Sequence, residues 1–231
     1  MGGRKAYFNE NYFENIDSED KAYFLGFIAA DGCVLDRGIN FKVMTIKINK
    51  KDIDILEKFK NKIEFSGNIT ISKCRPDMCS IYCTSVKMFN DLSKYYITPR
   101  KTNIIEFPLI PEKLIHHYMR GYFDGDGCVH IHKDKRRPGI VRGQINIISA
   151  SYIYIKKYVD ILVECANVKR NNIRDRKTNG RYYVIDWGGL SDVENIYNFL
   201  YKDAYTYLDR KKLKYDEVML INSLKTKYRK R

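Results

Sequence analysis

Apolar and polar positions follow two rhythms along this chain, and these rhythms recur in the same order. Apolar residues at helical spacing predict helices over residues 51–63, 86–95, 151–166 and 191–201. Period-two alternation and β-branched or aromatic runs predict a short strand before residue 39 and further strands over 39–48, 68–72, 79–84, 128–132, 141–148, 172–176 and 182–187. The pattern predicts an α+β fold of two similar halves.

One short segment occurs twice. Residues 22–34 (AYFLGFIAADGCV) return as residues 117–129 (HYMRGYFDGDGCV), and each position moves by the same interval, as from 31 to 126. The identical pairs are Tyr23/Tyr118, Gly26/Gly121, Asp31/Asp126, Gly32/Gly127, Cys33/Cys128 and Val34/Val129. Unrelated segments of this length would share roughly one residue, so the repeat indicates a duplication. With this segment as an opening helix, each half reads αββαββα.

Each copy is predicted to be a helix that ends at its Asp-Gly pair. Gly32 and Gly127 are expected to stop the two helices in the left-handed cap conformation. One turn earlier, small residues four positions apart would let two helix backbones approach closely. These small residues are Gly26 with Ala30, and Gly121 with Gly125. We therefore expect the two helices to pack against each other.

Such packing would bring Asp31 and Asp126 side by side at the C-terminal ends of the helices. Two close carboxylates repel each other, and the negative ends of both helix dipoles add to that repulsion. A divalent cation relieves it, and Mg²⁺ prefers one or two carboxylates together with water and phosphate oxygens. For either Asp alone, a helix-terminal residue before a cap glycine is the favoured interpretation. The duplication favours a metal site, with Mg²⁺ as the expected ion and Mn²⁺ as its substitute.

The charge balance points to a polyanionic partner. Lys and Arg number 42 against 28 Asp and Glu, and the formal net charge of +14 is spread along the chain. Nucleic acid is the simplest partner, although some basic proteins merely bind acidic surfaces. The longest apolar runs, such as residues 24–30, are far shorter than the ~20 residues of a membrane span, and no signal-peptide pattern opens the chain. We expect a soluble intracellular protein, with its compartment undetermined.

The cysteines show no metal-binding pattern. They occupy positions 33, 74, 79, 83, 128 and 165 without a CxxC pair, and no His pair has zinc-finger spacing. We expect free, reduced thiols, several of them buried, with Cys33 and Cys128 as small core residues beneath a sheet. His130 and His132 share a strand face but lack a third zinc ligand, so contact with nucleic acid is the better interpretation.

The segments Phe24–Gly32 and Met119–Gly127 resemble the two signature helices of a single-chain LAGLIDADG homing endonuclease. The αββαββα order of both halves is similar to that family too. The resemblance implies a DNA endonuclease that serves intron homing, with the motif helices at the interface between its halves. It further implies that Asp31 and Asp126 are catalytic metal ligands, and that both strands of a long asymmetric target are cut to leave 3′ overhangs.

Two positions break the symmetry of the halves. The sixth motif position is Asp124 in the second copy but Ala29 in the first, so we expect Asp124 to support structure rather than chemistry. The resemblance also implies a basic residue near the end of the second strand, where this chain has Asn49-Lys50 and then, in the second half, Ser149-Ala150. Lys50 is therefore a third catalytic candidate, which would make the half-sites cut at unequal rates. The alternative is a surface lysine that starts a helix.

We expect five segments along the chain. They are an N-terminal arm at 1–20, a first LAGLIDADG half at 21–103, a linker at 104–111, a second half at 112–215 and a basic tail at 216–231. The protein is expected to be a monomer without an obligate protein partner, whose antiparallel sheets form a saddle over double-stranded DNA. Two domains of ~100 residues would span roughly 70 Å, or about 20 base pairs.

The polar face of the predicted sheets is expected to read the DNA, since Arg and Gln suit bidentate contacts with guanine and adenine. An ordinary solvated face is the alternative. In the first half, Asn40 and Lys42 have the opposite parity from Thr45 and Lys47, which indicates a bulge or a misread strand edge. The candidates for the DNA-facing surface are Arg37, Asn40, Lys42, Lys47, Thr70, Ser72, Tyr82, His130, His132, Arg142, Gln144, Asn146, Arg174, Arg176, Arg181 and Tyr183. The candidates for phosphate contact are Arg100, Lys101, Arg210, Lys211 and residues 225–231, the last with a solubilising end as alternative.

Two rival functions stay open at this point. An RNA-binding intron maturase on the same scaffold would tolerate loss of the carboxylates, and a DNA-binding regulator would keep the fold without cutting. The presence of both Asp31 and Asp126 disfavours the regulator, because drift would relieve their repulsion if no metal were bound. An embedded intein domain is not expected, since the chain starts with Met and shows no flanking splicing segments.

Overall fold

A computed structural model describes residues 6–133, 141–177 and 182–229 of the 231-residue chain. The first half contains α1 (Glu19–Asp31), β1 (Gly32–Asp36), β2 (Lys42–Asn49), α2 (Ile53–Lys62), β3 (Thr70–Ile71), β4 (Met78–Thr84) and α3 (Val86–Lys94). The second half contains α4 (Ile115–Asp126), β5 (Gly127–Lys133), β6 (Val141–Ser149), α5 (Tyr152–Cys165), β7 (Arg174–Arg176), β8 (Tyr182–Trp187) and α6 (Leu190–Tyr201), and α7 (Asp209–Arg229) follows. The predicted α+β class and the αββαββα order of both halves are confirmed.

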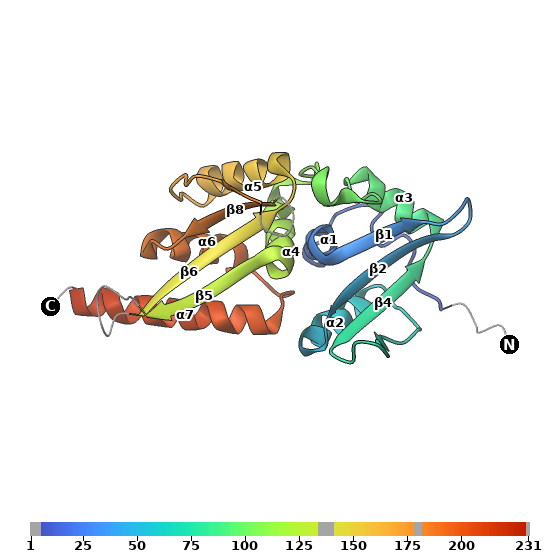
Figure 1. The fold of residues 1–231 in the computed structure, drawn as a ribbon, viewed down its shortest axis with the longest axis horizontal. Coiled ribbons are helices and arrows are strands. Elements are labelled where there is room, and N and C mark those ends of the chain that lie inside the picture. The colour runs from blue at the N-terminus through green and yellow to red at the C-terminus, as the bar shows by residue number, and fades with distance from the viewer. Residues whose placement is uncertain (1–5, 134–140, 178–181, 230–231) are drawn as a thin grey trace.

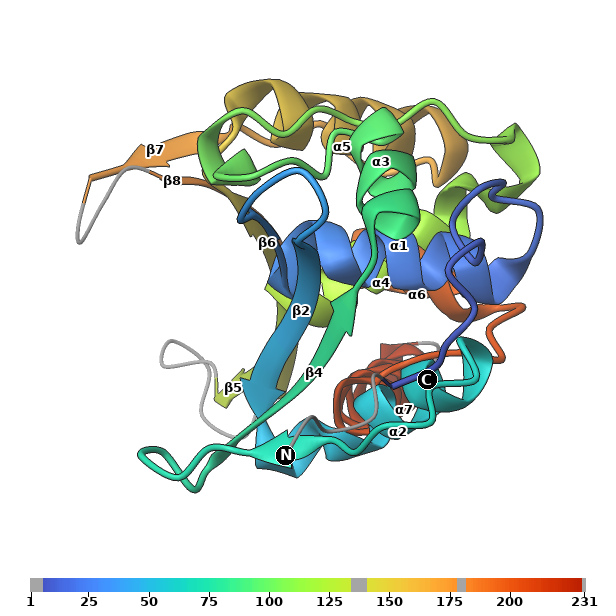
Figure 2. The same cartoon turned by 90° about the vertical axis from the view of Figure 1, so that its right-hand side faces the viewer.

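The two halves have the same sheet topology. Their strand orders are β1-β2-β4-β3 and β5-β6-β8-β7, with every neighbouring pair antiparallel. The motif helices α1 and α4 lie at the junction of the halves, with one sheet on either side (Figure 1). Seen at right angles, the strands curve along one side of the molecule and the helices lie behind them (Figure 2).

Strand alternation separates the core from an outer polar face. On β2, Met44, Ile46 and Ile48 are buried while Lys47 is exposed, and on β6 Ile145 and Ile147 are buried. The inward residues of both sheets belong to one hydrophobic core that also includes the faces of α1 and α4. The sheets are therefore held to the same central helices, which fixes one sheet relative to the other.

The strand β2 explains the irregular parity of the first half. It begins only at Lys42, so Asn40 lies in the turn before it, and the registers of β2 with β1 and with β4 both run without a skipped residue. The strand edge was misread and this part of the sheet has no bulge. Lys42 shares the inward parity of Met44, and its ammonium packs over the Phe89 ring at 5.2 Å and pairs with Asp36.

The prediction of left-handed caps at the glycines after the motif helices is wrong. Gly32 has φ −80° and ψ 151°, and Gly127 has φ −85° and ψ 160°, both extended. Each begins a strand directly, so the chain needs no reversal there. Glycine is required for space, because a Cβ would lie 2.6 Å from Ile28 O at the first site and 2.5 Å from Phe123 O at the second.

The cysteines that follow these glycines do not lie in the core, which corrects the expectation for Cys33 and Cys128. Gly32 and Val34 are buried on the inner face of β1, and Cys33 between them is exposed because successive residues of a strand face opposite sides. Cys128 has the equivalent position on β5 and is half-buried. All six cysteines are free, and Cys79 and Cys83 are the buried ones.

Close approach of α1 and α4 depends on their glycines. A methyl group on Gly26 would stand 1.9 Å from Tyr118 O, and one on Gly121 would stand 1.9 Å from Tyr23 O. The two contacts mirror each other across the helix pair. Each glycine therefore lies against the backbone of the opposite helix, where no side chain fits.

Helix α7 was not predicted, because its segment is rich in Lys and its apolar positions are sparse. Tyr215 and Val218 are nevertheless fully buried. Val218 lies over Gly143 of β6, where an added Cβ would be 2.1 Å from Val218 Cγ1. Packing on the second sheet thus supports a helix that continues through residue 216, where we expected the basic tail to begin. Neither α7 nor another helix within the described ranges has the length and hydrophobicity needed to cross a membrane.

Candidate active site and nucleic-acid interface

The two motif aspartates end the helices that join the halves. Asp31 is the last residue of α1 and Asp126 is the last residue of α4. A methyl group on Gly125 would stand 3.1 Å from Asp31 Oδ2, so the first-half carboxylate lies against the end of the second-half helix. The charge of Asp126 is close enough to raise the pKa of Asp31. Both carboxylates therefore belong to one site.

Both carboxyl groups are held in surroundings that disfavour their charge. Protein atoms crowd the Asp31 carboxyl although its side chain reaches solvent, and this burial, with the Asp126 charge next, raises the pKa of Asp31 to about 6. Burial likewise raises the pKa of Asp126, against the lowering effects of the Tyr122 hydroxyl and of Lys101 and Lys211. Negative charge is thus under-compensated at this site.

These donors fit a hard divalent cation. Carboxylate oxygens are ligands that Mg²⁺ accepts, and a cation would stabilise the charged form that burial disfavours. In the portion of the chain that the structure describes, no three His, Cys, Asp or Glu side chains cluster to hold a metal. A cation at Asp31 and Asp126 would therefore complete its shell with water and phosphate oxygens.

Two buried lysines flank the carboxylates but differ in their bonding. Lys211 Nζ donates to the carbonyl oxygens of Phe123 at 2.8 Å and Asp124 at 2.6 Å, and also to those of Gly125 and Gly127. It thereby caps the C-terminal end of α4 with a positive charge. Lys101 Nζ donates no hydrogen bond to a described residue, and its surroundings include Asp126 and Asp31. Burial lowers the pKa of both lysines.

The sequence predicts phosphate contacts for both lysines, and the structure buries both of them. Lys101 is 7% and Lys211 is 6% exposed. Lys211 is occupied by the carbonyl groups of α4, because that helix end has unsatisfied acceptors that need a donor. Lys101 Nζ, which bonds to no residue that the structure describes, lies at the edge of the carboxylate site.

Asp124 is a structural member of the site, held by three donors. It accepts hydrogen bonds from the Tyr201 hydroxyl at 2.6 Å, the Tyr23 hydroxyl at 2.8 Å and the Leu208 backbone nitrogen at 2.8 Å. The residue is 2% exposed, and burial raises the pKa of its carboxyl group. Tyr23 comes from the first half, so this buried carboxylate also ties the two halves together.

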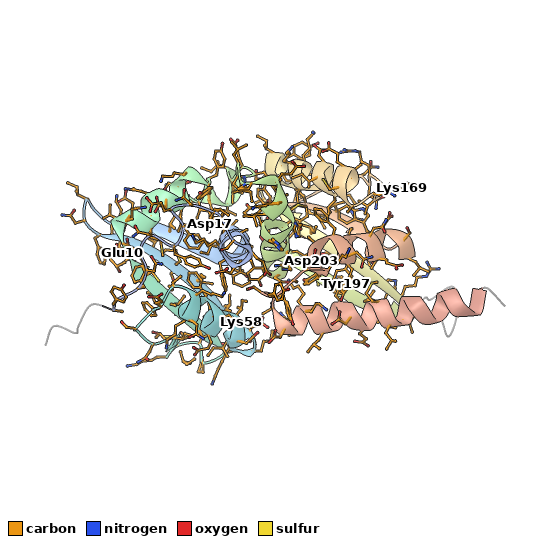
Figure 3. All side chains as sticks on the ribbon, turned by 180° about the vertical axis from the view of Figure 1, so that it is seen from behind. Glu10, Asp17, Lys58, Lys169, Tyr197 and Asp203 are labelled. Carbon is orange, nitrogen blue, oxygen red and sulfur yellow. The ribbon has the colours of Figure 1, made fainter. Side chains whose placement is uncertain are left out.

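Ion pairs cross between the halves beside the same site. Arg210 grips Asp52 with two hydrogen bonds, Nε to Oδ1 at 2.7 Å and Nη2 to Oδ2 at 2.9 Å. Lys58 Nζ, which Figure 3 shows near the junction, donates to Asp209 Oδ1 at 2.6 Å and to Tyr207 O at 3.0 Å. The start of α7 is therefore bound to α2 of the first half, and Arg210 is paired rather than free for phosphate.

A cavity of about 300 Å³ opens beside Asp31. Its wall joins the ends of α1 and α4 to the end of β2 and the start of α7. Asn49 and Lys51 contribute to the wall, whereas Lys50 between them does not. The lining residues are Phe27, Asp31, Lys47, Ile48, Asn49, Lys51, Asp52, Met78, Asp124, Gly125, Leu208 and Arg210.

Most candidates for reading DNA lie at the surface that the strands present. Those that are exposed are Arg37, Asn40, Lys47, Thr70, Tyr82, Arg100, His130, His132, Arg174 and Arg176. Those that are half-buried are Ser72, Arg142, Gln144 and Asn146. Arg181 lies outside the described residues, and so do the side chains of residues 225–231. Apart from Arg100, which follows α3, the exposed set lies on the strands and turns of the two sheets and forms a polar surface there.

Two candidates point to the other side of the sheet. Lys42 faces the helix layer, as its contact with Phe89 shows. Tyr183 has the parity of buried Ile185, and its ring lies 5.1 Å from that of Tyr152 at the start of α5. Neither therefore belongs to the polar surface, because strand parity decides which face a side chain joins.

Sequence reasoning missed three residues that the structure places in or beside these surfaces. They are Asp52, Lys51 and Asp186. Asp52 meets a partner 158 positions away, which no local pattern reveals. Lys51 stands next to the predicted Lys50 in the same basic run, and it lines the cavity whereas Lys50 does not. Asp186 was hidden within a run of strand-forming residues.

Comparisons with known proteins show which families and folds this chain is similar to. Residues 114–202 match the family model of the LAGLIDADG-like domain. The probable translation initiation factor IF-2 of Methanocaldococcus jannaschii is 23% identical over 193 residues, which cover 79% of this chain and 15% of that protein. This chain therefore spans a small part of that relative's length.

Solved structures share the fold over nearly the whole chain. The I-LtrWI LAGLIDADG homing endonuclease bound to target DNA is 16% identical with a TM-score of 0.63, covering 95% of this chain and 92% of that one. The meganuclease I-SmaMI bound to uncleaveable DNA is 16% identical with a TM-score of 0.64, covering 90% of both chains. The chain is therefore a two-repeat protein with the fold of the LAGLIDADG homing endonucleases, and its second half matches the model of the LAGLIDADG-like domain.

Proposed function

We propose that the protein is a site-specific homing endonuclease that makes a metal-dependent double-strand break in a long asymmetric DNA target. The observation that carries the proposal is the meeting of Asp31 and Asp126 at the ends of two docked helices, between two polar sheet surfaces. Solved DNA-bound structures of the same fold support duplex DNA as the partner. We further propose a monomer, a target of roughly 20 base pairs and 3′ overhangs.

Asp31 and Asp126 would hold Mg²⁺, with Mn²⁺ as a substitute. The ion, when bound, supplies charge neutralisation at the scissile phosphate and acidifies a water molecule. The two carboxylates, one from each half of the protein, would hold the ion where the reacting phosphates of the two strands meet the site. Lys101, whose ammonium bonds to no acceptor among the described residues, donates a hydrogen bond to the phosphate there, and Lys211 holds the end of α4 in place.

The Asp31 half-site is proposed to use a basic residue from the end of β2. Lys50 was the prediction, and Lys51 joins it because its side chain lines the cavity beside Asp31. The second half has Ser149 and Ala150 at the corresponding strand end. The two strands are therefore expected to be nicked at different rates. Equal nicking rates in the parent protein, Lys50→Ala and Lys51→Ala would remove this part of the proposal.

The proposal is tested by cleavage selection from a randomised DNA duplex library with Mg²⁺, followed by variants on the selected site. Asp31→Asn and Asp126→Asn are expected to stop cutting and to leave binding largely intact. Asp36→Asn makes the same chemical change at the far end of β1 and should cut normally. If either motif variant cuts at full rate, the assigned carboxylate role is wrong. RNA-splicing assistance that survives both substitutions would indicate the maturase instead.

A further inference from the structure

The carboxylate of Asp186 lies among the side chains of the second sheet that are candidates for reading bases. Asp186 on β8 is directly opposite Asn146 on β6 in the strand register, so it faces the polar surface. Its Oδ1 accepts a hydrogen bond from Gln144 Nε2 at 3.1 Å, and its Oδ2 pairs with Arg174 Nη2 on β7. A negative charge on a surface that approaches phosphates costs binding energy unless it has a specific task.

Asp186 fixes which atoms Gln144 presents to a ligand. An ionised carboxylate only accepts hydrogen bonds, so the amide nitrogen of Gln144, and not its oxygen, must face Asp186. One N–H of the amide is thereby engaged. The oxygen and the second N–H remain, and these form the donor and acceptor pair that matches the N6 and N7 edge of adenine.

The same carboxylate restrains Arg174. One nitrogen of the guanidinium is paired with Asp186, which leaves the remaining donors of its planar fork for a second partner. Such a fork matches the O6 and N7 acceptors of guanine. The pairing also cancels the charge of Arg174, so this cluster adds direction rather than net attraction to DNA.

The first half lacks this device. Gly32 pairs with Ile46 and Gly127 pairs with Ile147, which makes Thr45 the counterpart of Asn146. Thr45 pairs with Tyr82, so Tyr82 occupies the place that Asp186 holds in the second half. The Gln144 position corresponds to Val43, which cannot form hydrogen bonds through its side chain. The two sheets therefore differ in how they would read a base pair.

We infer that Asp186 is a positioning residue for sequence recognition: it orients Gln144 and Arg174 so that the second sheet selects adenine and guanine at neighbouring base pairs. This inference rests on the proposed binding of duplex DNA. Asp186 acts through its two partners and does not itself contact the bases. Asp186→Asn removes the constraint, because an amide can donate to the Gln144 oxygen and allow that side chain to turn over.

The test is a binding selection from a randomised duplex library in EDTA, so that it is independent of cutting. Gln144→Ala and Arg174→Ala first identify the base pairs that each side chain reads. Asp186→Asn is expected to lower the preference for adenine and guanine at those base pairs by about tenfold or more, and to leave all other positions unchanged. Glu164→Gln on α5, exposed in the helix layer, makes the same charge change and should leave the whole profile unchanged.

The outcomes separate this inference from the proposed function. If the parent protein selects a sequence and Asp186→Asn selects the same sequence with the same strength, the positioning role is wrong while DNA recognition stands. A uniform loss at every position, with a lowered melting temperature, would also overturn it, because it would mark Asp186 as a residue of the fold alone. If the parent selects no sequence at all, the proposed function and this inference fail together.

Discussion

Asp31 of the first half lies against Gly125 of the second half: a methyl group on Gly125 would stand 3.1 Å from Asp31 Oδ2 and 2.4 Å from Ala30 Cβ. The carboxylate site is therefore built from both repeats, and its geometry depends on how closely α1 and α4 approach. Changes to that approach should affect stability and the proposed chemistry together.

Gly121→Ala should destabilise the protein strongly. Its new methyl group would be 1.9 Å from Tyr23 O, a backbone atom that cannot move without displacing α1. We expect a loss of about 3 kcal/mol or more in the free energy of unfolding, measured in urea. Gly188→Ala is the matched control, since nothing lies within 4 Å of the added carbon, and it should change stability by less than about 0.5 kcal/mol. Similar stabilities for the two variants would contradict the close contact.

Removing the charge of Asp31 and removing the charge of Asp124 should change the stability of the protein in opposite directions. Burial and the Asp126 charge raise the pKa of Asp31 to about 6, so at pH 7.5 its ionised form costs folding free energy. Asp31→Asn should therefore raise the melting temperature without metal by about 2–4 °C, as expected for roughly 1 kcal/mol. Asp124→Asn should lower the free energy of unfolding by about 1–3 kcal/mol. The amide nitrogen of Asn cannot accept a hydrogen bond, so at least one of the three groups that donate to Asp124 would lose its acceptor. Thermal unfolding of both variants distinguishes a strained functional acid from a structural one.

Substitutions of the two buried lysines should have different effects on the free energy of unfolding. Lys211→Met leaves the carbonyl groups at the end of α4 without their charged donor, and we expect a loss of about 3 kcal/mol in unfolding free energy. Lys101→Met removes no hydrogen bond to a described residue and should stay within about 1 kcal/mol of the parent. On the selected DNA site, Lys101→Met should still lower the cutting rate. Equal destabilisation by both substitutions would show that the lysines are equivalent.

His117 should make stability depend on pH. Arg120 Nη1 donates to His117 Nδ1 at 2.9 Å, and burial, then the charge of Arg120 and His116, lower the pKa of His117 to about 3. Unfolded His has a pKa near 6.5. Between these values the unfolded state binds the extra proton, so His117 contributes stability above about pH 6.5 that is lost as the pH falls. Relative to His117→Asn, the parent should lose about 1 kcal/mol per pH unit between pH 6.5 and 5 in urea unfolding. Parallel pH profiles would contradict the shift.

Local periodicity determined much of this protein. The αββαββα order of both halves follows from the spacing of apolar residues, because helices and strands each impose their own period on a short stretch of chain. The duplication also placed Asp31 and Asp126 at equivalent helix ends. These features need no knowledge of distant contacts, which is why the sequence predicts them.

Tertiary structure alone decided the pairings and the faces. Lys211 meets α4, Arg210 meets Asp52 and Asp186 meets Gln144, and each pair is joined across at least 42 positions by the packing of separate elements. Helix α7 is supported by the packing of Val218 on Gly143, where no side chain intervenes. The Lys-rich sequence of α7 does not predict this contact. Sequence patterns constrain neighbours along the chain, whereas a buried charge is bonded or free according to what the folded chain brings beside it.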